Sequence, residues 1–313
     1  MTVYFLGWKA RYDKIMIERL GQSHAARMLE VPSYSRRVVR LSRTLGRLIG
    51  RPLSLNWLGR RVSASNGATS SDVLICSEAQ LKRGRHMHLV SGFPGKRILL
   101  VRDLVDASFV EQMRPLFSHI YSYDPVQCER LGMEYLEQFF PFNVEDARPK
   151  PDSVDSASDT LRCFFLGRDK GRAQRLEALA AELVMLGCNV DFCIVKDDTS
   201  QVVGTYHVDE VLSYEANLTR AMGSDVLVEI NQPGQTGLTL RPLEAAFFDK
   251  KLITDNKRVR DTDFYHPDRF YVLGDETRGL QQFLASKAPS VAPETLRKHS
   301  PAGLMDRLLE ISV

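Results

Sequence analysis

Short apolar runs alternate with amphipathic segments through the second half of the chain. Strands are predicted at 162–167, 190–195, 225–230, 251–254 and 270–273, because each run is short, apolar and bounded by polar or glycine residues. Helices are predicted at 172–186, where Leu176, Leu179 and Leu183 share one face, at 214–222 and at 240–248. Strands that alternate with helices predict a parallel sheet covered by helices, which is a Rossmann-like domain.

The first half shows a less regular form of the same pattern. Strands are predicted at 3–6, 73–76, 97–101 and 120–123, with helices at 109–117 and 125–137 among the segments between them. Residues 144–160 are polar, contain two prolines and have the composition of a linker. The 313 residues therefore divide into expected domains at 1–143 and 161–313, the second closed by a helix at 304–311. We predict an α/β protein with two Rossmann-like domains facing a central cleft.

Composition narrows the class of protein. Hydrophobic residues make up 43% and charged residues 26%, and the net charge of +3 is too small to indicate nucleic acid by itself. The five cysteines are scattered without a C-x-x-C pair, so neither a disulfide framework nor a zinc site is predicted. There is no apolar run near eighteen residues and no signal-peptide pattern at the start. We expect a cytoplasmic protein with reduced, buried thiols.

Candidate chemistry first appears in the loop that follows the strand at 162–167. Ligands of open α/β sheets bind at the carboxyl ends of the strands. In this loop Gly167 lets the backbone approach a ligand, the next helix offers unpaired N–H groups, and Arg168 and Lys170 add charges suited to a diphosphate. A plain surface charge is the alternative for Arg168. The loop lacks the G-x-G-x-x-G pattern, so a dinucleotide fingerprint is absent.

A second polar loop follows the strand at 225–230. Its sequence Gln-Pro-Gly-Gln-Thr-Gly-Leu-Thr is too rich in glycine and polar residues for a mere connection, and it runs into a helix with Pro242 in the first turn. Glu244 lies about two turns in, where its carboxylate can accept two ribose hydroxyls, or can simply be solvated. Tyr214, before another helix, either stacks on a nucleobase or is an ordinary half-buried tyrosine. The expected ligand-binding set of this loop and helix is Gln235, Thr236, Gly237, Leu238, Thr239, Arg241 and Glu244.

The run from Glu229 to Glu244 resembles the donor-binding signature of GT-B glycosyltransferases, in which a glycine-rich loop precedes a helix carrying Pro-Leu-Glu-Ala. The resemblance implies that Glu244 holds the ribose of a nucleotide diphosphate sugar. It also implies that the 235–239 segment lines the diphosphate and sugar, and that Arg168 and Lys170 form the basic pair on the diphosphate. Retaining members carry an acidic residue where this chain has Thr236, so a retaining mechanism is not implied.

Further runs are similar to bacterial lipopolysaccharide and capsule biosynthesis proteins, among them 121–125, 213–218, 250–256 and 263–267. This likeness implies transfer of a hexose-like sugar, from a UDP-sugar above all, to a glycan or lipid-linked acceptor of a bacterial surface polysaccharide. No cofactor is implied. A nucleotide-sugar epimerase of the same fold, or a non-catalytic GT-B-like module that binds a glycan or a partner, remains an alternative.

Metal independence is expected, because basic residues and helix termini can stabilise a leaving diphosphate. The Asp261-Thr-Asp263 sequence is interpreted as a polar loop, and no histidine–cysteine cluster has metal-ligand spacing. For an inverting reaction a catalytic base is expected from the first domain. Asp103 and Asp124 both follow predicted strands, although Asp124 can instead cap the helix that follows. Glu78 and His86 are further candidates for this base.

Residues 31–71 contain eight arginines and no acidic residue. Apolar residues such as Leu41 and Leu45 lie largely on one face of the helix predicted there, and five arginines lie on the other: Arg36, Arg40, Arg43, Arg47 and Arg51. One interpretation is a helix packed on its domain with a solvated basic face. The other is contact with an anionic membrane surface or a phosphorylated, lipid-linked acceptor, which implies a peripheral position on the inner membrane. Nucleic acid is not expected, because few aromatic residues are interleaved.

Overall fold

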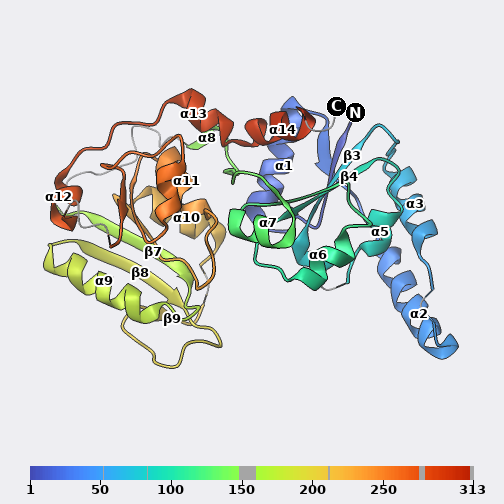
Figure 1. Ribbon diagram of the computed structural model, residues 1–313, viewed down its shortest axis with the longest axis horizontal. Coiled ribbons are helices and arrows are strands. Elements are labelled where there is room, and N and C mark those ends of the chain that lie inside the picture. The colour runs from blue at the N-terminus through green and yellow to red at the C-terminus, as the bar shows by residue number, and fades with distance from the viewer. Residues whose placement is uncertain (52, 83, 148–159, 211, 275–278, 311–313) are drawn as a thin grey trace. The chain divides into compact units, whose positions relative to one another are not determined.

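The computed structural model describes residues 1–51, 53–82, 84–147, 160–210, 212–274 and 279–310. They form two compact units, Met1–Glu137 and Gln138–Glu310 (Figure 1). The division thus falls ahead of the polar segment 144–160, of which Val144–Ala147 form helix α8 and 148–159 lie outside the described residues. No described helix is both long and apolar enough to cross a bilayer.

The first unit is built on a six-stranded parallel sheet with the order β2-β1-β3-β4-β5-β6. Its strands are β1 (Val3–Leu6), β2 (Ala26–Met28), β3 (Val73–Ser77), β4 (Lys96–Val101), β5 (His119–Ser122) and β6 (Glu134–Tyr135). Both β1 and β3 are buried along their whole length, as expected for a parallel sheet that is covered on both faces. The sequence pattern missed β2 and β6, because these edge strands are too short to show a period.

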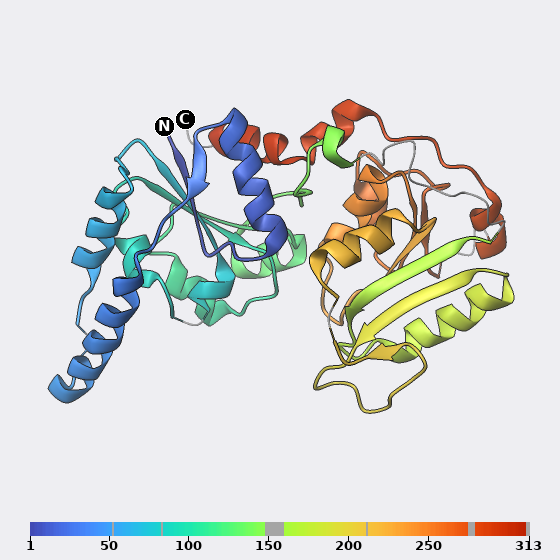
Figure 2. The same cartoon turned by 180° about the vertical axis from the view of Figure 1, so that it is seen from behind.

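Helices of the first unit flank this sheet (Figures 1 and 2). They are α1 (Arg11–Ser23), α2 (Ser33–Ile49), α3 (Asn56–Ser65), α4 (Glu78–Leu81), α5 (Met87–Ser91), α6 (Ala107–Met113) and α7 (Pro125–Leu131). The prediction of one helix over 125–137 is wrong, because Gly132 takes a left-handed conformation with φ 62° and ends α7. Tyr4, Leu74 and Leu99 lie at the centre of the core and are fully buried.

The second unit carries another six-stranded parallel sheet, with the order β12-β11-β10-β7-β8-β9. Its strands are β7 (Arg162–Arg168), β8 (Asn189–Val195), β9 (His207–Val208), β10 (Val226–Glu229), β11 (Lys251–Thr254) and β12 (Phe270–Val272). All five predicted strands are present. The short edge strand β9 was not predicted.

The helical elements of the second unit, besides α8, are α9 (Ala173–Met185), α10 (Tyr214–Met222), α11 (Leu240–Phe247), the 3₁₀ helix η1 (Lys257–Asp261), α12 (Leu280–Ala285), α13 (Pro293–Lys298) and α14 (Pro301–Glu310). Ser213 caps α10, because its hydroxyl accepts a hydrogen bond from the Ala216 amide at 3.1 Å. Leu176 and Leu183 of α9 are fully buried in the core against the sheet.

Strand order fixes where a ligand can bind in each sheet. In the second sheet the chain runs from β7 to β8 and β9 on one side, and then from β10 to β12 on the other. The order therefore reverses between β7 and β10, and in the first sheet it reverses between β1 and β3. A crevice forms at such a reversal, outside the carboxyl ends of the strands. The predicted fold class, an α/β protein with two Rossmann-like sheets, is confirmed.

Candidate ligand site in the second unit

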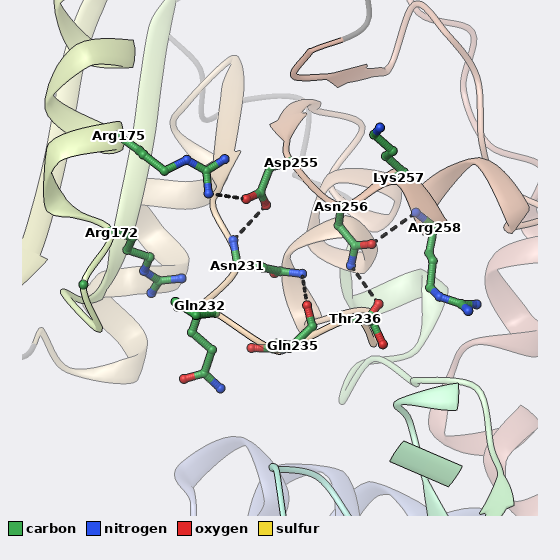
Figure 3. A pocket seen from close by; sticks show the side chains of 12 residues that line it. Arg172, Arg175, Asn231, Gln232, Gln235, Thr236, Asp255, Asn256, Lys257 and Arg258 are labelled. Carbon is green, nitrogen blue, oxygen red and sulfur yellow. Dashed lines mark hydrogen bonds and ion pairs between the residues drawn. The ribbon is translucent and has the colours of Figure 1, made fainter. Parts of the chain in front are cut away.

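A cavity of about 510 Å³ lies at the point where the second sheet reverses its strand order. Three loops line it: the start of α9 after β7, residues 231–236 after β10, and residues 255–258 after β11 (Figure 3). Its lining includes one carboxylate, Asp255, and four basic side chains, those of Arg172, Arg175, Lys257 and Arg258. The cavity is therefore electropositive, which favours an anionic ligand.

The loop after β10 is held in one shape by the loop after β11. The Asn231 amide donates to Asp255 Oδ1 at 2.8 Å, and the Asn256 side-chain amide donates to the Gly237 carbonyl at 3.2 Å. Within the loop, the Gln235 amide donates to the Gln232 carbonyl, and Gly234 between them has a φ of 79°. That left-handed conformation suits glycine and strains other residues. The wall of the cavity is thus preorganised.

A buried carboxylate supports the same loop from below. Glu229, at the end of β10, accepts a hydrogen bond from the Thr254 hydroxyl at 2.6 Å and another from the Thr239 hydroxyl. Burial raises the pKa of Glu229, although the two hydroxyl groups act in the opposite direction. Thr239 also caps α11 by accepting from the Arg241 amide at 3.0 Å. The Glu229 carboxylate and the Thr239 hydroxyl therefore both stabilise the local fold.

Glu244, the predicted ribose ligand, lies in α11 outside the cavity lining. It is 5% exposed, so the alternative of a solvated helix residue is wrong. Its Oε2 pairs with Arg241 Nη1 at 2.5 Å, and Arg241 also stacks over the Phe164 ring. Burial raises the pKa of Glu244, against the effect of Arg241. Within the described residues, Glu244 Oε1 has no hydrogen-bond partner, so one oxygen remains able to accept.

The loop after β7 differs from its expected form. Its amide groups are already used: Lys170 N donates to Asp197 Oδ2 at 3.0 Å and Gly171 N donates to Thr199 Oγ1 at 2.8 Å. At the start of α9, the Ala173 amide donates to Asp169 Oδ1 at 3.0 Å. The expectation that this loop has unpaired N–H groups available to bind a phosphate is therefore wrong. Side chains from the loop after β8, 27 or more positions away, satisfy the first two of them.

Local packing requires a glycine at position 167. A Cβ at this position would lie 2.6 Å from an Arg172 guanidinium nitrogen. That guanidinium crosses the strand ends, donates to the Arg168 carbonyl at 3.0 and 3.1 Å, and also donates to the Ile230 carbonyl. Gly167 thus makes room for Arg172, which lines the cavity in place of Arg168 and Lys170. The exposed Arg168 and the half-buried Lys170 lie outside the lining, and their predicted role stays a prediction.

Among the residues predicted around the second loop, Gln235 and Thr236 line the cavity, whereas Gly237, Leu238, Thr239 and Arg241 do not. Tyr214 begins α10 and is half-buried, with its ring parallel to that of Phe142 at 6.3 Å between centroids. This arrangement fits the alternative of an ordinary half-buried tyrosine.

The two leading candidate bases of the first unit, Asp103 and Asp124, have local partners. Asp103 is exposed, and its Oδ1 accepts from the Leu104 amide at 2.9 Å. Asp124 is buried and caps α7, because its Oδ1 accepts from the Gln127 amide at 3.0 Å. The capping alternative for Asp124 is therefore observed. Their catalytic roles stay predictions.

The sequence reasoning missed the loop after β11 and with it two cations of the site. Lys257 and Arg258 are exposed, and neither side chain has a partner in the described part of the chain. The available signal was their position, directly after the predicted strand at 251–254, because loops at neighbouring parallel strand ends meet. The same described part contains no group of three or more histidine, cysteine or acidic residues suited to a metal ion.

No family model matches the chain, and no curated protein matches it. The solved structures to which it is similar include three at 9% to 12% identity: the GtfA/B complex, the pneumococcal O-GlcNAc transferase GtfA with UDP and GlcNAc, and the spinosyn forosaminyltransferase SpnP. The matches cover 82%, 80% and 100% of this chain, with TM-scores of 0.42, 0.45 and 0.46. This chain spans 60% and 53% of the length of the first two and 99% of the third. With TM-scores below 0.5, these likenesses leave the fold and the activity to be argued from the chain's own residues.

Proposed function

We propose that this chain is a glycosyltransferase that takes its sugar from a nucleotide diphosphate sugar held by the second unit. One observation carries the proposal: a preorganised, electropositive cavity lies at the strand-order reversal, lined by Arg172, Arg175, Lys257 and Arg258. Its volume of about 510 Å³ is within the range of small-ligand pockets. Cations in this place suit the charge that grows on a departing diphosphate.

Each part of the donor has a matching group. Lys257 and Arg258, whose side chains lack partners among the described residues, bind the diphosphate. Gln232 and Gln235 of the preorganised loop hydrogen-bond sugar hydroxyls. Glu244 accepts a ribose hydroxyl through Oε1 while Arg241 holds its other oxygen. In the reaction the bond between the anomeric carbon and the diphosphate oxygen breaks. An acceptor hydroxyl forms the new bond at that carbon and gives its proton to a base.

The finer parts of the proposal rest on the sequence resemblance. The donor is a UDP-sugar, and the acceptor is a glycan or lipid-linked precursor of a bacterial surface polysaccharide. The four basic side chains suffice to stabilise the leaving group, so we propose that no metal ion takes part. Asp103 and Asp124 remain the candidate bases of the first unit.

Calorimetric titration with UDP, GDP and CMP tests the donor site directly. We expect UDP to bind with a dissociation constant in the micromolar range, that is, with about −8 kcal/mol. Glu244→Gln keeps the size of the side chain and removes its charge, so ribose binding should weaken by about tenfold. Absence of binding to all three nucleotides contradicts the proposal.

Turnover separates the transferase from the two alternatives. With a UDP-sugar and a glycan acceptor, a transferase releases UDP in proportion to the glycan extended. An epimerase interconverts the UDP-sugars without an acceptor, and a non-catalytic module binds UDP without consuming any UDP-sugar. Either of these two results replaces the proposed activity while keeping the site.

A further inference from the structure

Helix α2 packs on the first unit through a stripe of its own small residues. Its buried positions are Ser35, Ser42 and Gly46, and Val38 and Val39 beside them pack against the core. These positions recur at helical spacing, so they form one face. In both views the C-terminal part of α2 extends away from the sheet of its unit (Figures 1 and 2).

The large apolar residues of α2 lie outside this packed face. Leu41 is 63% exposed, Leu45 47%, Leu48 78% and Ile49 55%. The interpretation in which these leucines pack the helix onto its domain is therefore wrong, because small side chains take that place. Within one unit, a row of large aliphatic side chains left in water is unfavourable by about 25 cal/mol for each Å² that stays uncovered. Such a row marks a surface that binds something.

A second exposed face of α2 is basic. Arg36, Arg40, Arg43 and Arg47 are all exposed, and the one hydrogen bond that their side chains make within the described residues joins Arg43 to the Gly84 carbonyl at 3.3 Å. At about 100° per residue, this arginine face and the leucine face lie on opposite flanks of the outer surface, roughly 155° apart. Between them they cover the part of the helix that its unit leaves uncovered.

We propose that α2 docks on an anionic lipid surface, with its leucine face in the acyl boundary and its arginine face on the lipid phosphates. Charge selects this occupant. A second copy of the chain would cover the leucine face but leave both arginine faces without a counter-charge, because the segment 31–71 has no acidic residue to supply one. Nucleic acid would use the arginines but leave the leucines in water. An interfacial helix uses both.

This inference does not depend on the proposed donor site, because α2 belongs to the other unit. Sedimentation with vesicles tests it. One set of vesicles holds phosphatidylcholine with about a third phosphatidylglycerol, and the other holds phosphatidylcholine alone. We expect binding to the anionic set to exceed binding to the neutral set by at least about tenfold, and to weaken between 0.1 M and 1 M salt as the Debye length falls.

Two variants separate the two faces. Arg40→Gln with Arg43→Gln and Arg47→Gln should weaken binding to anionic vesicles by about a hundredfold, at the usual contribution of a basic residue near such a surface. Leu41→Ser with Leu45→Ser and Leu48→Ser should weaken binding by more than about tenfold, in high salt as well as in low salt. All six residues are exposed, so thermal unfolding should show a folded protein.

Matched controls remove the same chemistry elsewhere. Arg130, Lys287 and Arg297 are exposed cations that can be changed to glutamine together, and Met185 and Val202 are exposed apolar residues that can be changed to serine. These variants should bind vesicles like the unchanged protein.

Three results overturn the proposal. One is equal binding to neutral and anionic vesicles, and another is binding that survives both sets of substitutions. The third is a dimer in solution, measured by sedimentation velocity, that the leucine substitutions dissociate without any vesicle binding. UDP affinity should be unchanged in both α2 variants, so failure here and failure of the donor site remain distinguishable.

Discussion

Both sheets are parallel, have six strands and reverse their strand order once, but they treat their strand ends in opposite ways. At the reversal in the first sheet, Arg102 after β4 pairs with Asp13 of α1 at 2.8 Å and stacks over Trp8 and Tyr12. Its amide donates to the buried Glu78 at 3.2 Å. At the reversal in the second sheet, the side chains of Lys257 and Arg258 have no partner among the described residues. The first end satisfies its own charges. The second end pairs Arg175 with Asp255 at 2.8 Å but leaves the side chains of Lys257 and Arg258 unpaired within the described residues.

This difference teaches that the fold supplies only the place for a site. A parallel sheet creates the crevice in both units, but side chains decide whether it is closed by an internal ion pair or left open. Substitutions at the first end should therefore change stability, and those at the second end should change binding.

The largest effect is expected from Arg102→Met. Asp13 would remain buried without its ion-pair partner, and the loss should be about 3–5 kcal/mol of unfolding free energy in the first unit. Urea unfolding measures it, and Asp13→Asn together with Arg102→Met should recover part of the loss. UDP affinity should stay unchanged. A loss below about 1 kcal/mol would mean that the first end is not held by its ion pair.

At the second end, Lys257→Ala with Arg258→Ala should raise the dissociation constant for UDP about a hundredfold, since two charge-assisted hydrogen bonds are lost. Stability should change by no more than about 0.5 kcal/mol, because both side chains are exposed. Lys287→Ala with Arg297→Ala is the matched control. A full loss of affinity in Arg168→Ala with Lys170→Ala, but none in the 257/258 variant, would return the diphosphate to the loop after β7.

A smaller effect, on stability, is expected from a substitution of Asp169 in the loop after β7. Asp169→Ala removes the acceptor of the Ala173 amide and of the Ser200 hydroxyl, which should destabilise the second unit by about 1–2 kcal/mol. Burial raises the pKa of Asp169, but hydrogen bonds from Ser200, Ala173 and His207 outweigh it and hold the pKa below the ordinary 3.8.

The pH dependence gives this prediction a sign. A lowered pKa in the folded state means that the stabilisation is complete above the unfolded value and is lost as pH falls through the folded value. The stability difference between the unchanged protein and Asp169→Ala should therefore be constant from pH 7 to about 5 and shrink below about 4. Denaturant unfolding across this range measures it, and a gap that widens in acid contradicts the assignment.

The smallest effect is expected from Asp124→Asn. Asparagine caps a helix as well as aspartate does, so stability should change by no more than about 0.5 kcal/mol. Asp124→Ala, by contrast, should lose about 1 kcal/mol. If Asp124→Asn instead lowers kcat by about a hundredfold with stability intact, Asp124 is the base after all.

The fold was largely predictable from the sequence, because buried parallel strands such as Val226–Glu229 are continuous apolar runs that glycine and polar residues bound. The position of the site followed from the same pattern. Its chemistry did not. Whether the Lys170 amide is open to a ligand depends on Asp197, 27 positions away. Two of the four cations of the site, Lys257 and Arg258, come from a loop with no glycine-rich signature. Such pairings arise only when the loops are folded side by side.

One of the two interpretations of α2, in which its leucines pack on the domain, is wrong for a related reason. Apolar periodicity normally marks the packed face of a helix, but Ser35, Ser42 and Gly46 fill that role here. Nothing within a single chain distinguishes a leucine row that faces a core from one that faces a partner.

The way α2 packs on its unit also determines which of its residues can vary among related proteins. Folding constrains only the residues on the packed face of the helix, so substitutions on its outer surface are nearly neutral for stability. Without a use, drift and selection for solubility would replace the outer leucines with polar residues over generations. Descendants that keep both the small residues of the packed face and the exposed leucines would record selection on the surface itself. Descendants that keep the small residues of the packed face and lose the exposed leucines would show that the outer surface is no longer under selection.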